Sequence, residues 1–293
     1  RLKLMTRKNK TKDISVVIPT VGEESLINLI EDLKVGTVVP KEIIVVCPKE
    51  KFNLLNNKIC QNVIVLKSTK SGQVAQRFMG IQRASYNIIL QLDADIILKK
   101  NTLEELLRAY HLKGPKVAIT ANVKVFDFNN QIINSIFKEN KIKKVFKFLG
   151  GGNINILDNK DEFRFDSWFV TYEQPNRSKY VNVIPGGCTL FNKKYYRNFD
   201  YYPLKGHAIG EDILNSIYLK QYGNKLYFEK KAVIFQPKSS GYDHVTFKQL
   251  FYFLLKMYII KKIACKLVNG NIYRYHLWFI YFFIISIIKY MLK

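Results

Sequence analysis

Cysteine is scarce in this chain of 293 residues, which contains four. None of the four belongs to a C-x-x-C pair, and their spacing is not that of a metal site. A disulfide framework is therefore not expected, and we expect reduced thiols in a protein that faces the cytosol. No signal peptide is expected at the N-terminus, because residues 1–12 are basic and no apolar segment precedes Asp13.

Acidic residues are also in short supply. The sequence has 23 Asp and Glu against 47 Lys and Arg, which gives a formal net charge of +24. A charge of this sign and size attracts polyanions such as nucleic acid, anionic lipid surfaces or phosphorylated substrates, although a Lys-rich coding bias would raise the total in the same way. The shortage is greatest at the ends, since residues 1–12 contain no acid and no Asp or Glu follows Asp243. Because 48% of the residues are hydrophobic, a disordered basic chain is excluded.

A long hydrophobic run is missing too. The longest apolar segment, residues 277–288, falls short of the ~20 residues that a membrane-spanning helix needs. Residues 246–293 nevertheless combine apolar and aromatic side chains with lysines, as helices at a membrane interface do. We expect this segment to form helices that bind an anionic membrane surface, in a peripheral or monotopic manner at the cytoplasmic face of the cell membrane. A buried helical hairpin or a contact between copies of the chain is the alternative.

Short apolar runs alternate with helical patterns through the first half of the chain. The expected strands are residues 14–19, 42–47, 62–66 and 87–92, and the main expected helices are residues 23–34, 71–84 and 102–111. This order is typical of βαβ units and a mostly parallel sheet that helices cover. A capping box formed by Thr102 and Glu105 is expected at the start of the third helix. After residue 126 the pattern is irregular until an expected strand at 181–191, a helix at 211–222 and two strands at 225–229 and 232–236.

Two aspartates, Asp93 and Asp95, follow the strand expected at residues 87–92. Open α/β sheets bind ligands at the carboxyl ends of their strands. Two carboxylates at this spacing can converge on a hard divalent cation, while a bound diphosphate supplies further oxygens. A D-x-D tripeptide in a solvated turn carries no such meaning, so its position after a buried strand is what makes it a candidate metal site.

Four stretches carry a resemblance to a known family. They are SVVIPTVGEE (15–24), SGQVAQRFMGI (71–81), ASYNIILQLDADIIL (84–98) and AIGEDILNSIYLKQYG (208–223). Together they resemble the family 2 glycosyltransferases over about residues 13–240. The resemblance implies a GT-A-like, Rossmann-like α/β fold with a mixed, mostly parallel sheet flanked by helices. It also implies a nucleoside diphosphate sugar donor, with Mn²⁺ or Mg²⁺ held between the D-x-D and the donor diphosphate.

The resemblance, together with the composition of the two ends, predicts a division of the chain. Residues 1–12 would be a basic N-terminal extension, and residues 13–245 the glycosyltransferase domain. Within that domain, residues 13–126 would bind the nucleotide sugar and residues 127–245 the acceptor. Residues 246–293 would be the membrane-associated helices.

The resemblance implies nucleotide contacts after the first strand. Thr20 and a carboxylate from Glu23 or Glu24 are the candidates there, although acids in the first turn of a helix are also favoured by its dipole. The family usually has an acid at the end of the second strand, whereas this chain has Cys47 there and its nearest acid is Glu50. The base of the nucleotide is therefore not predicted.

Further donor contacts are implied around the D-x-D. Gln73 and Arg77 open the helix that precedes it, and Arg77 is expected near the nucleotide or a diphosphate oxygen, with an exposed surface position as the alternative. Asp93 would lie near the ribose or sugar. Gly186 and Gly187 would allow the backbone to approach a bound sugar closely.

The catalytic residues that the resemblance implies are Asp212 and Glu211. A sugar hydroxyl needs a base to remove its proton, whereas a phosphate acceptor is already an anion. We assign Asp212 as the base and Glu211 as its support, with compensation of the helix dipole as the alternative. Asp95 would bind the metal with Asp93, and His244 is a candidate third ligand.

The function expected from these features is metal-dependent transfer of a sugar, with inversion, to a hydroxyl of a saccharide acceptor that is lipid-linked or part of a cell-surface glycan. One alternative is a polyprenyl-phosphate sugar synthase. Another is a non-enzymatic basic protein that binds membrane or nucleic acid, which would leave both acidic motifs unexplained. Nucleic acid is not an expected partner.

Overall fold

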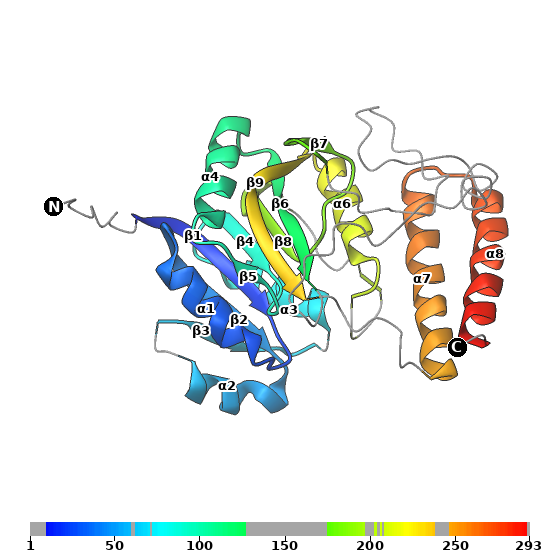
Figure 1. Ribbon diagram of the computed structural model, residues 1–293, viewed down its shortest axis with the longest axis horizontal. Helices are drawn as coiled ribbons and strands as arrows, with labels where there is room; N and C mark the ends of the chain where they lie inside the picture. Colours follow the sequence, from blue (N-terminus) through cyan, green and yellow to red (C-terminus); the bar gives the residue numbers. More distant parts are fainter. Residues whose placement is uncertain are drawn as a thin grey trace.

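The computed structural model describes residues 10–59, 62–70, 72–126, 175–196, 202–203, 206, 208–237 and 246–291. Most of the expected N-terminal extension and the start of the expected acceptor half, residues 127–174, lie outside the described residues. The described chain is a mixed α/β structure with a long curled sheet and a pair of helices at one end (Figure 1).

The elements follow one another in a simple order. Their bounds are β1 (Lys10–Pro19), α1 (Ser25–Val35), β2 (Val38–Cys47), η1 (Lys49–Lys51), α2 (Phe52–Lys58), β3 (Ile64–Lys67), α3 (Gln73–Arg83), β4 (Ile88–Leu92), β5 (Ile97–Leu98), α4 (Thr102–Lys113), β6 (Val117–Phe126), β7 (Lys179–Val181), β8 (Cys188–Asn192), η2 (Lys193–Tyr195), α6 (Glu211–Gln221), β9 (Lys225–Pro237), α7 (Phe247–Leu267) and α8 (Ile272–Met291).

The described strands form one sheet in the order β3-β2-β1-β4-β8-β6-β9-β5, and β7 pairs with β9. The ladders among β1, β2, β3 and β4 are parallel. β8 then runs antiparallel to both of its neighbours, β4 and β6, while β6 and β9 are parallel. The expected mixed sheet is confirmed, but the expectation that it is mostly parallel is wrong for the second half, because β8 enters between β4 and β6 from the opposite direction.

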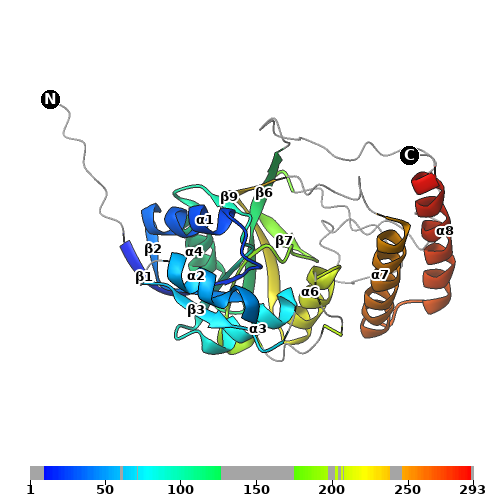
Figure 2. The ribbon, with the colours of Figure 1, turned by 90° about the horizontal axis from the view of Figure 1, so that it is seen from below.

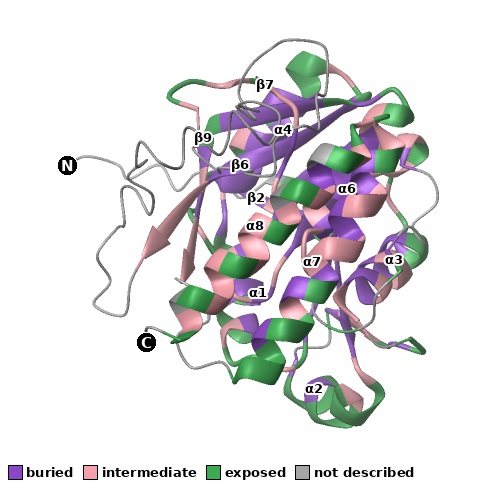
Figure 3. Ribbon diagram, turned by 90° about the vertical axis from the view of Figure 1, so that its right-hand side faces the viewer, coloured by how far each residue is buried: buried purple, intermediate pink, exposed green. Residues whose placement is uncertain are grey.

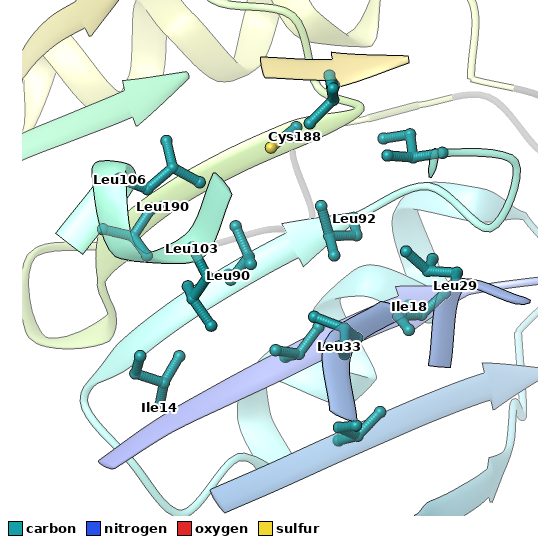
Figure 4. Close-up of a cluster of buried hydrophobic side chains, with 14 of the residues drawn as sticks. Ile14, Ile18, Leu29, Leu33, Leu90, Leu92, Leu103, Leu106, Cys188 and Leu190 are labelled. Atoms are coloured by element: carbon teal, nitrogen blue, oxygen red, sulfur yellow. The ribbon is translucent and has the colours of Figure 1, made fainter. Parts of the chain in front are cut away.

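Helices cover both faces of this sheet, and each face has its own core. One core joins side chains of α1 and α4 to those of β1, β4 and β8 (Figure 4). The other joins α3 to the opposite faces of the same strands, with Val17, Ile81 and Phe191 at its centre. Strands buried on both sides are continuous apolar runs, which is why residues 14–18 and 43–47 are almost completely buried.

Three expectations need correction in detail. The strand expected at 181–191 is interrupted: β7 ends at Val181, β8 begins at Cys188, and the Gly186–Gly187 pair lies in the loop between them. The two strands expected at 225–236 are one strand, β9, whose pairing with β6 shifts register between Ala121 and Asn122. Thr102 does not form the expected capping box, because its hydroxyl donates to the Val233 carbonyl oxygen at 2.6 Å.

A helical hairpin follows the sheet. α7 starts with a capping box in which Thr246 and Gln249 bond each other's backbone N–H groups, a feature that the sequence analysis missed. α7 packs on α6 through Ile260 and Ala264, and α8 packs on α7 through a cluster around Tyr275. In Figures 1 and 2 the two helices stand side by side at the end of the molecule opposite β1 and β2. Among the described residues no helix is both long and apolar enough to cross a membrane.

Candidate active site

Most of the predicted site residues that the structure describes lie at one end of the strands, beyond the carboxyl ends of β1 and β4. β1 and β4 are adjacent and parallel, so the loops after Pro19 and Leu92 leave the sheet on the same side. β8 is antiparallel to β4, with Cys188 opposite Leu92, which brings the residues just before β8 to the same end of the strands. Open α/β sheets bind their ligands at the carboxyl ends of the strands.

Arg77 lies between the D-x-D loop and the start of α6. Its side chain projects from α3 and is only 4% exposed. Nη2 lies 2.5 Å from Oδ1 of Asp93, and Nη1 lies 2.7 Å from Oε2 of Glu211. Burial by itself lowers the pKa of Arg77, but the charges of Asp93 and Glu211 outweigh this effect and raise it. One guanidinium therefore joins the D-x-D loop to the start of α6.

The loop before β8 packs against these two ion pairs and leaves no room for side chains at Gly186 and Gly187. A Cβ on Gly186 would lie 2.6 Å from Oε2 of Glu211 and 3.2 Å from Nη1 of Arg77, and one on Gly187 would lie 3.1 Å from Oδ2 of Asp93. Two hydrogen bonds hold the loop in place: Gln91 Nε2 donates to the Gly186 carbonyl at 2.5 Å, and the Asp93 N–H donates to the Gly187 carbonyl at 2.9 Å. The glycines thus permit protein groups to approach one another; their predicted approach to a sugar stays a prediction.

The two aspartates of the D-x-D lie in different surroundings. Oδ1 of Asp93 accepts from Gln73 Nε2 at 3.0 Å as well as from Arg77. Asp95 has a weaker neighbour, Gln236 Nε2 at 3.5 Å. Burial raises the pKa of the Asp95 carboxyl, and the negative charge of Asp93 raises it further. Asp95 is thus a partly buried carboxylate whose charge the protein compensates poorly.

This donor set fits a divalent cation in its chemistry. Carboxylate oxygens are the ligands that Mg²⁺ and Mn²⁺ favour, and a cation would relieve the repulsion between Asp93 and Asp95. No group of three His, Cys, Asp or Glu side chains in the described ranges could hold a metal, so the protein part of such a site would be this pair. His244, the candidate third ligand, lies outside the described residues.

The loop after β1 carries the other predicted donor contacts. The carboxylate of Glu23 accepts from the Thr20 hydroxyl and, at 3.0 Å, from the Val21 N–H. It also lies near enough to Asp95 to raise the pKa of that group slightly. Glu24 is exposed and occupies the N-cap of α1 without a side-chain capping bond. Of these two acids, Glu23 is the one that bonds Thr20 and whose charge acts on Asp95.

The start of α6 supplies the predicted base. Gly210 caps the helix with φ +65°, a left-handed conformation in which other residues are strained. Asp212 is partly buried, and its Oδ1 accepts from the Ile213 N–H at 3.0 Å. Burial raises the pKa of Asp212 to about 6, against opposing effects of the Ile213 N–H, Arg77 and Lys261. An acid of this strength is ionised at neutral pH and still accepts a proton readily, as a general base must.

Lys261 is a site residue that the sequence analysis missed. It projects from α7, is 6% exposed, and its pKa is lowered to about 8 by burial, although the charge of Asp212 opposes this shift. A lysine next to another lysine in an apolar helix gives no sign in the sequence that it is buried. Gln91 and Gln236 were missed for the same reason, since only the folded chain places them against Gly186 and Asp95.

Comparisons with known proteins agree with this geometry. The sequence model described as glycosyl transferase family 2 matches residues 15–199, which is more than half of the chain and ends before Glu211. Among solved structures, a crystal structure of GalNAc-T7 with UDP, GalNAc and Mn²⁺ is similar in fold, with a TM-score of 0.57 and 18% sequence identity. The likeness covers 83% of this chain and 47% of that chain, so this chain corresponds to about half of its neighbour. No curated protein sequence matches the chain. The chain therefore belongs to glycosyl transferase family 2 and has a GT-A-like fold.

Proposed function

We propose that the protein transfers a sugar from a nucleoside diphosphate sugar to a hydroxyl group of a saccharide acceptor, with inversion at the anomeric carbon. One observation carries the proposal: Arg77 forms ion pairs with both Asp93 and Glu211. The pair of acids proposed to hold the donor and the pair proposed to handle the acceptor are therefore parts of one contact network. A donor phosphate and an acceptor hydroxyl would meet there, at the carboxyl ends of β1 and β4.

The donor side would be formed by Thr20, Glu23, Gln73, Asp93 and Asp95. Asp95, with Asp93, would hold Mn²⁺ or Mg²⁺, and such an ion stabilises the negative charge that grows on a departing diphosphate. The neighbouring structure that contains UDP and Mn²⁺ supports this choice of cofactor. Arg77 positions Asp93 by holding its Oδ1, so that Oδ2 is left for other contacts.

The acceptor side would be formed by α6. Asp212 would take the proton of the attacking hydroxyl on its carboxylate, and the oxygen would then attack the anomeric carbon opposite the leaving diphosphate. The pKa of about 6 supports this role, since a base near neutrality combines ionisation with proton affinity. Glu211 would fix the helix start through its ion pair with Arg77 rather than accept the proton.

A lipid-linked saccharide is the acceptor that we favour, because the α7 helix that contacts α6 also belongs to the hydrophobic hairpin. A polyprenyl-phosphate sugar synthase would share the donor side but would not need a base. The raised pKa of Asp212 favours the hydroxyl acceptor over this second candidate.

The experiment is nucleoside diphosphate release from a panel of UDP-, GDP- and ADP-sugars, with Mn²⁺ or with EDTA, by the wild type and by Asp95→Ala and Asp212→Asn. We expect turnover of one donor that EDTA and Asp95→Ala abolish. With a saccharide acceptor, Asp212→Asn should lose on the order of 100-fold or more in rate, the scale of general base catalysis. A mild effect of Asp212→Asn would point to a phosphate acceptor, and a product with retained anomeric configuration would exclude the single displacement.

A further inference from the structure

The outer face of the α7–α8 hairpin carries a continuous apolar stripe. Six large apolar residues of α8 are exposed, and they recur every three or four positions along the helix. They are Tyr273, Leu277, Ile280, Ile284, Ile288 and Met291. This spacing places them on one side of the helix, and a helix of 20 residues is about 30 Å long.

The first half of α7 extends this stripe. Phe247, Phe251, Tyr252 and Leu255 are exposed there. Phe251 contacts Phe283 and Phe247 contacts Tyr290, so the two helices are antiparallel. Figure 3, which looks at this end of the molecule, shows exposed residues recurring along α8 and at the lower end of α7. Patches of this kind mark an interaction surface rather than ordinary solvent-facing helix.

The surface also contains a shallow hollow between the helices. It has a volume of about 160 Å³ and is lined by Phe251, Leu255, Tyr258, Phe279 and Phe283. Its walls are almost wholly apolar, so it suits a hydrocarbon group better than a hydrated one.

Charge selects the partner of this surface. No Asp or Glu occurs in residues 244–293, whereas the same segment contains eight Lys and Arg, of which Lys256 and Lys261 are buried. Lys248 and Lys266 are exposed on α7, and Lys262 is partly exposed beside Tyr258. Contact with a second copy would bring two basic hairpins together, each on a chain of net charge +24, whereas anionic lipid headgroups would neutralise the lysines.

We propose that the outer face of the α7–α8 hairpin docks onto an anionic lipid surface. The apolar stripe enters the interface between headgroups and acyl chains, and the exposed lysines contact the headgroups. α7 faces two ways: its outer side belongs to this surface, and its inner side packs on α6 through Ile260 and holds Lys261 near Asp212. The lipid surface and the candidate active site are thus connected through one helix, which deepens the proposed function by placing a lipid-anchored acceptor within the reach of α6.

Flotation with vesicles tests the docking without any use of enzyme activity. The purified full chain is mixed with vesicles of phosphatidylcholine and phosphatidylglycerol or with vesicles of phosphatidylcholine alone. We expect the wild type to float with the anionic vesicles, less with the neutral ones, and less in high salt, which screens the lysines. Binding that is absent from the anionic vesicles, or equal for both kinds, would overturn the proposal.

Matched variants locate the surface. Ile280→Glu/Ile284→Glu should weaken partition onto anionic vesicles by at least about tenfold, because charged groups are costly in that environment. Leu54→Glu/Leu112→Glu is the control, since these residues are similarly exposed but lie on α2 and α4, and it should bind like the wild type. Equal binding by both variants would refute the assignment. Release of a lipid-free wild-type dimer into monomers by the Ile280/Ile284 change would make the face an interface between copies instead. In Ile280→Glu/Ile284→Glu, loss of flotation with donor turnover retained would uphold the docking. A wild type that floats but turns over no donor would count against the proposed function only.

Discussion

Removal of the Arg77 charge is the sharpest test of the site. In Arg77→Met, the carboxylates of Asp93 and Glu211 would lose the cation that lies 2.5 Å and 2.7 Å from them. Their side chains are 19% and 6% exposed, so water cannot fully replace it. Breaking a buried ion pair by removing one partner costs about 3–5 kcal/mol, and we expect a loss of this size in the free energy of unfolding.

The assay is equilibrium unfolding in guanidinium chloride, with Arg108→Met as the matched control. Arg108 also pairs with a carboxylate, that of Glu105, but its side chain is 46% exposed. Exposed pairs contribute about 0–1 kcal/mol, so the control should unfold almost like the wild type. Equal losses for the two variants would refute the idea of a buried bridge.

A double variant separates the charge from the packing of the side chain. Arg77→Met/Glu211→Gln removes the cation and one of the two acids that it faces. If the bridge is real, the double variant should be more stable than the sum of the two single changes predicts, with a coupling energy of about 0.5–3 kcal/mol. Arg77→Lys should lie between the wild type and Arg77→Met, because one ammonium does not reach two carboxylates as a guanidinium does.

Three further predictions concern the same site. Gly186→Ala should lower the rate of donor turnover by at least about tenfold, the effect of small displacements at a reacting centre, since its Cβ would lie 2.6 Å from Oε2 of Glu211 and 3.2 Å from Nη1 of Arg77; wild-type turnover would contradict the crowding. Lys261→Met should move the rising limb of the pH–rate profile from about pH 6 to higher pH, because the lysine charge lowers the pKa of Asp212. An unmoved limb would show that Lys261 does not act on the pKa of Asp212. Asp212→Asn should stabilise the fold at pH 7 by about 2 kcal/mol relative to pH 4, in thermal or denaturant unfolding. The sign follows because the pKa of Asp212 is about 6 in the folded chain against an ordinary 3.8. The folded state holds the proton more strongly, so the free energy of unfolding of the wild type falls as the pH rises from about 4 to 6. Asp212→Asn should lack this fall.

The first half of the fold was predictable because its signals are local. Buried parallel strands are continuous apolar runs. The strands expected at 14–19 and 42–47 lie within β1 and β2 and end where these end, although the first four residues of each were missed, and the strand expected at 87–92 differs from β4 only at Asn87. The helix predicted at 71–84 is α3 with its ends trimmed. Each of these elements was determined by the pattern of a dozen residues or fewer.

Elements whose form depends on distant partners were predicted poorly. The bulge in β9 exists because both parts of that strand pair with β6, and neither part shows this in its own sequence. The hydroxyl of Thr102 bonds a carbonyl of β9 in preference to its own helix. The antiparallel entry of β8 depends on the loop from Val183 to Gly187, which Gln91 of β4 and Asp93, just after β4, hold by hydrogen bonds.

The sequence by itself determined the family, the alternation of strands and helices, and the identities of Asp93, Asp95, Glu211 and Asp212 as candidate site residues. These follow from short motifs and from the periodicity of apolar residues. Only the tertiary structure decided that Arg77 bridges the two acidic motifs, that Lys261 faces Asp212 from another helix, and that Asp212 has a pKa of about 6. The physical reason is that burial and electrostatic interaction depend on distance in space, and these groups are far apart along the chain.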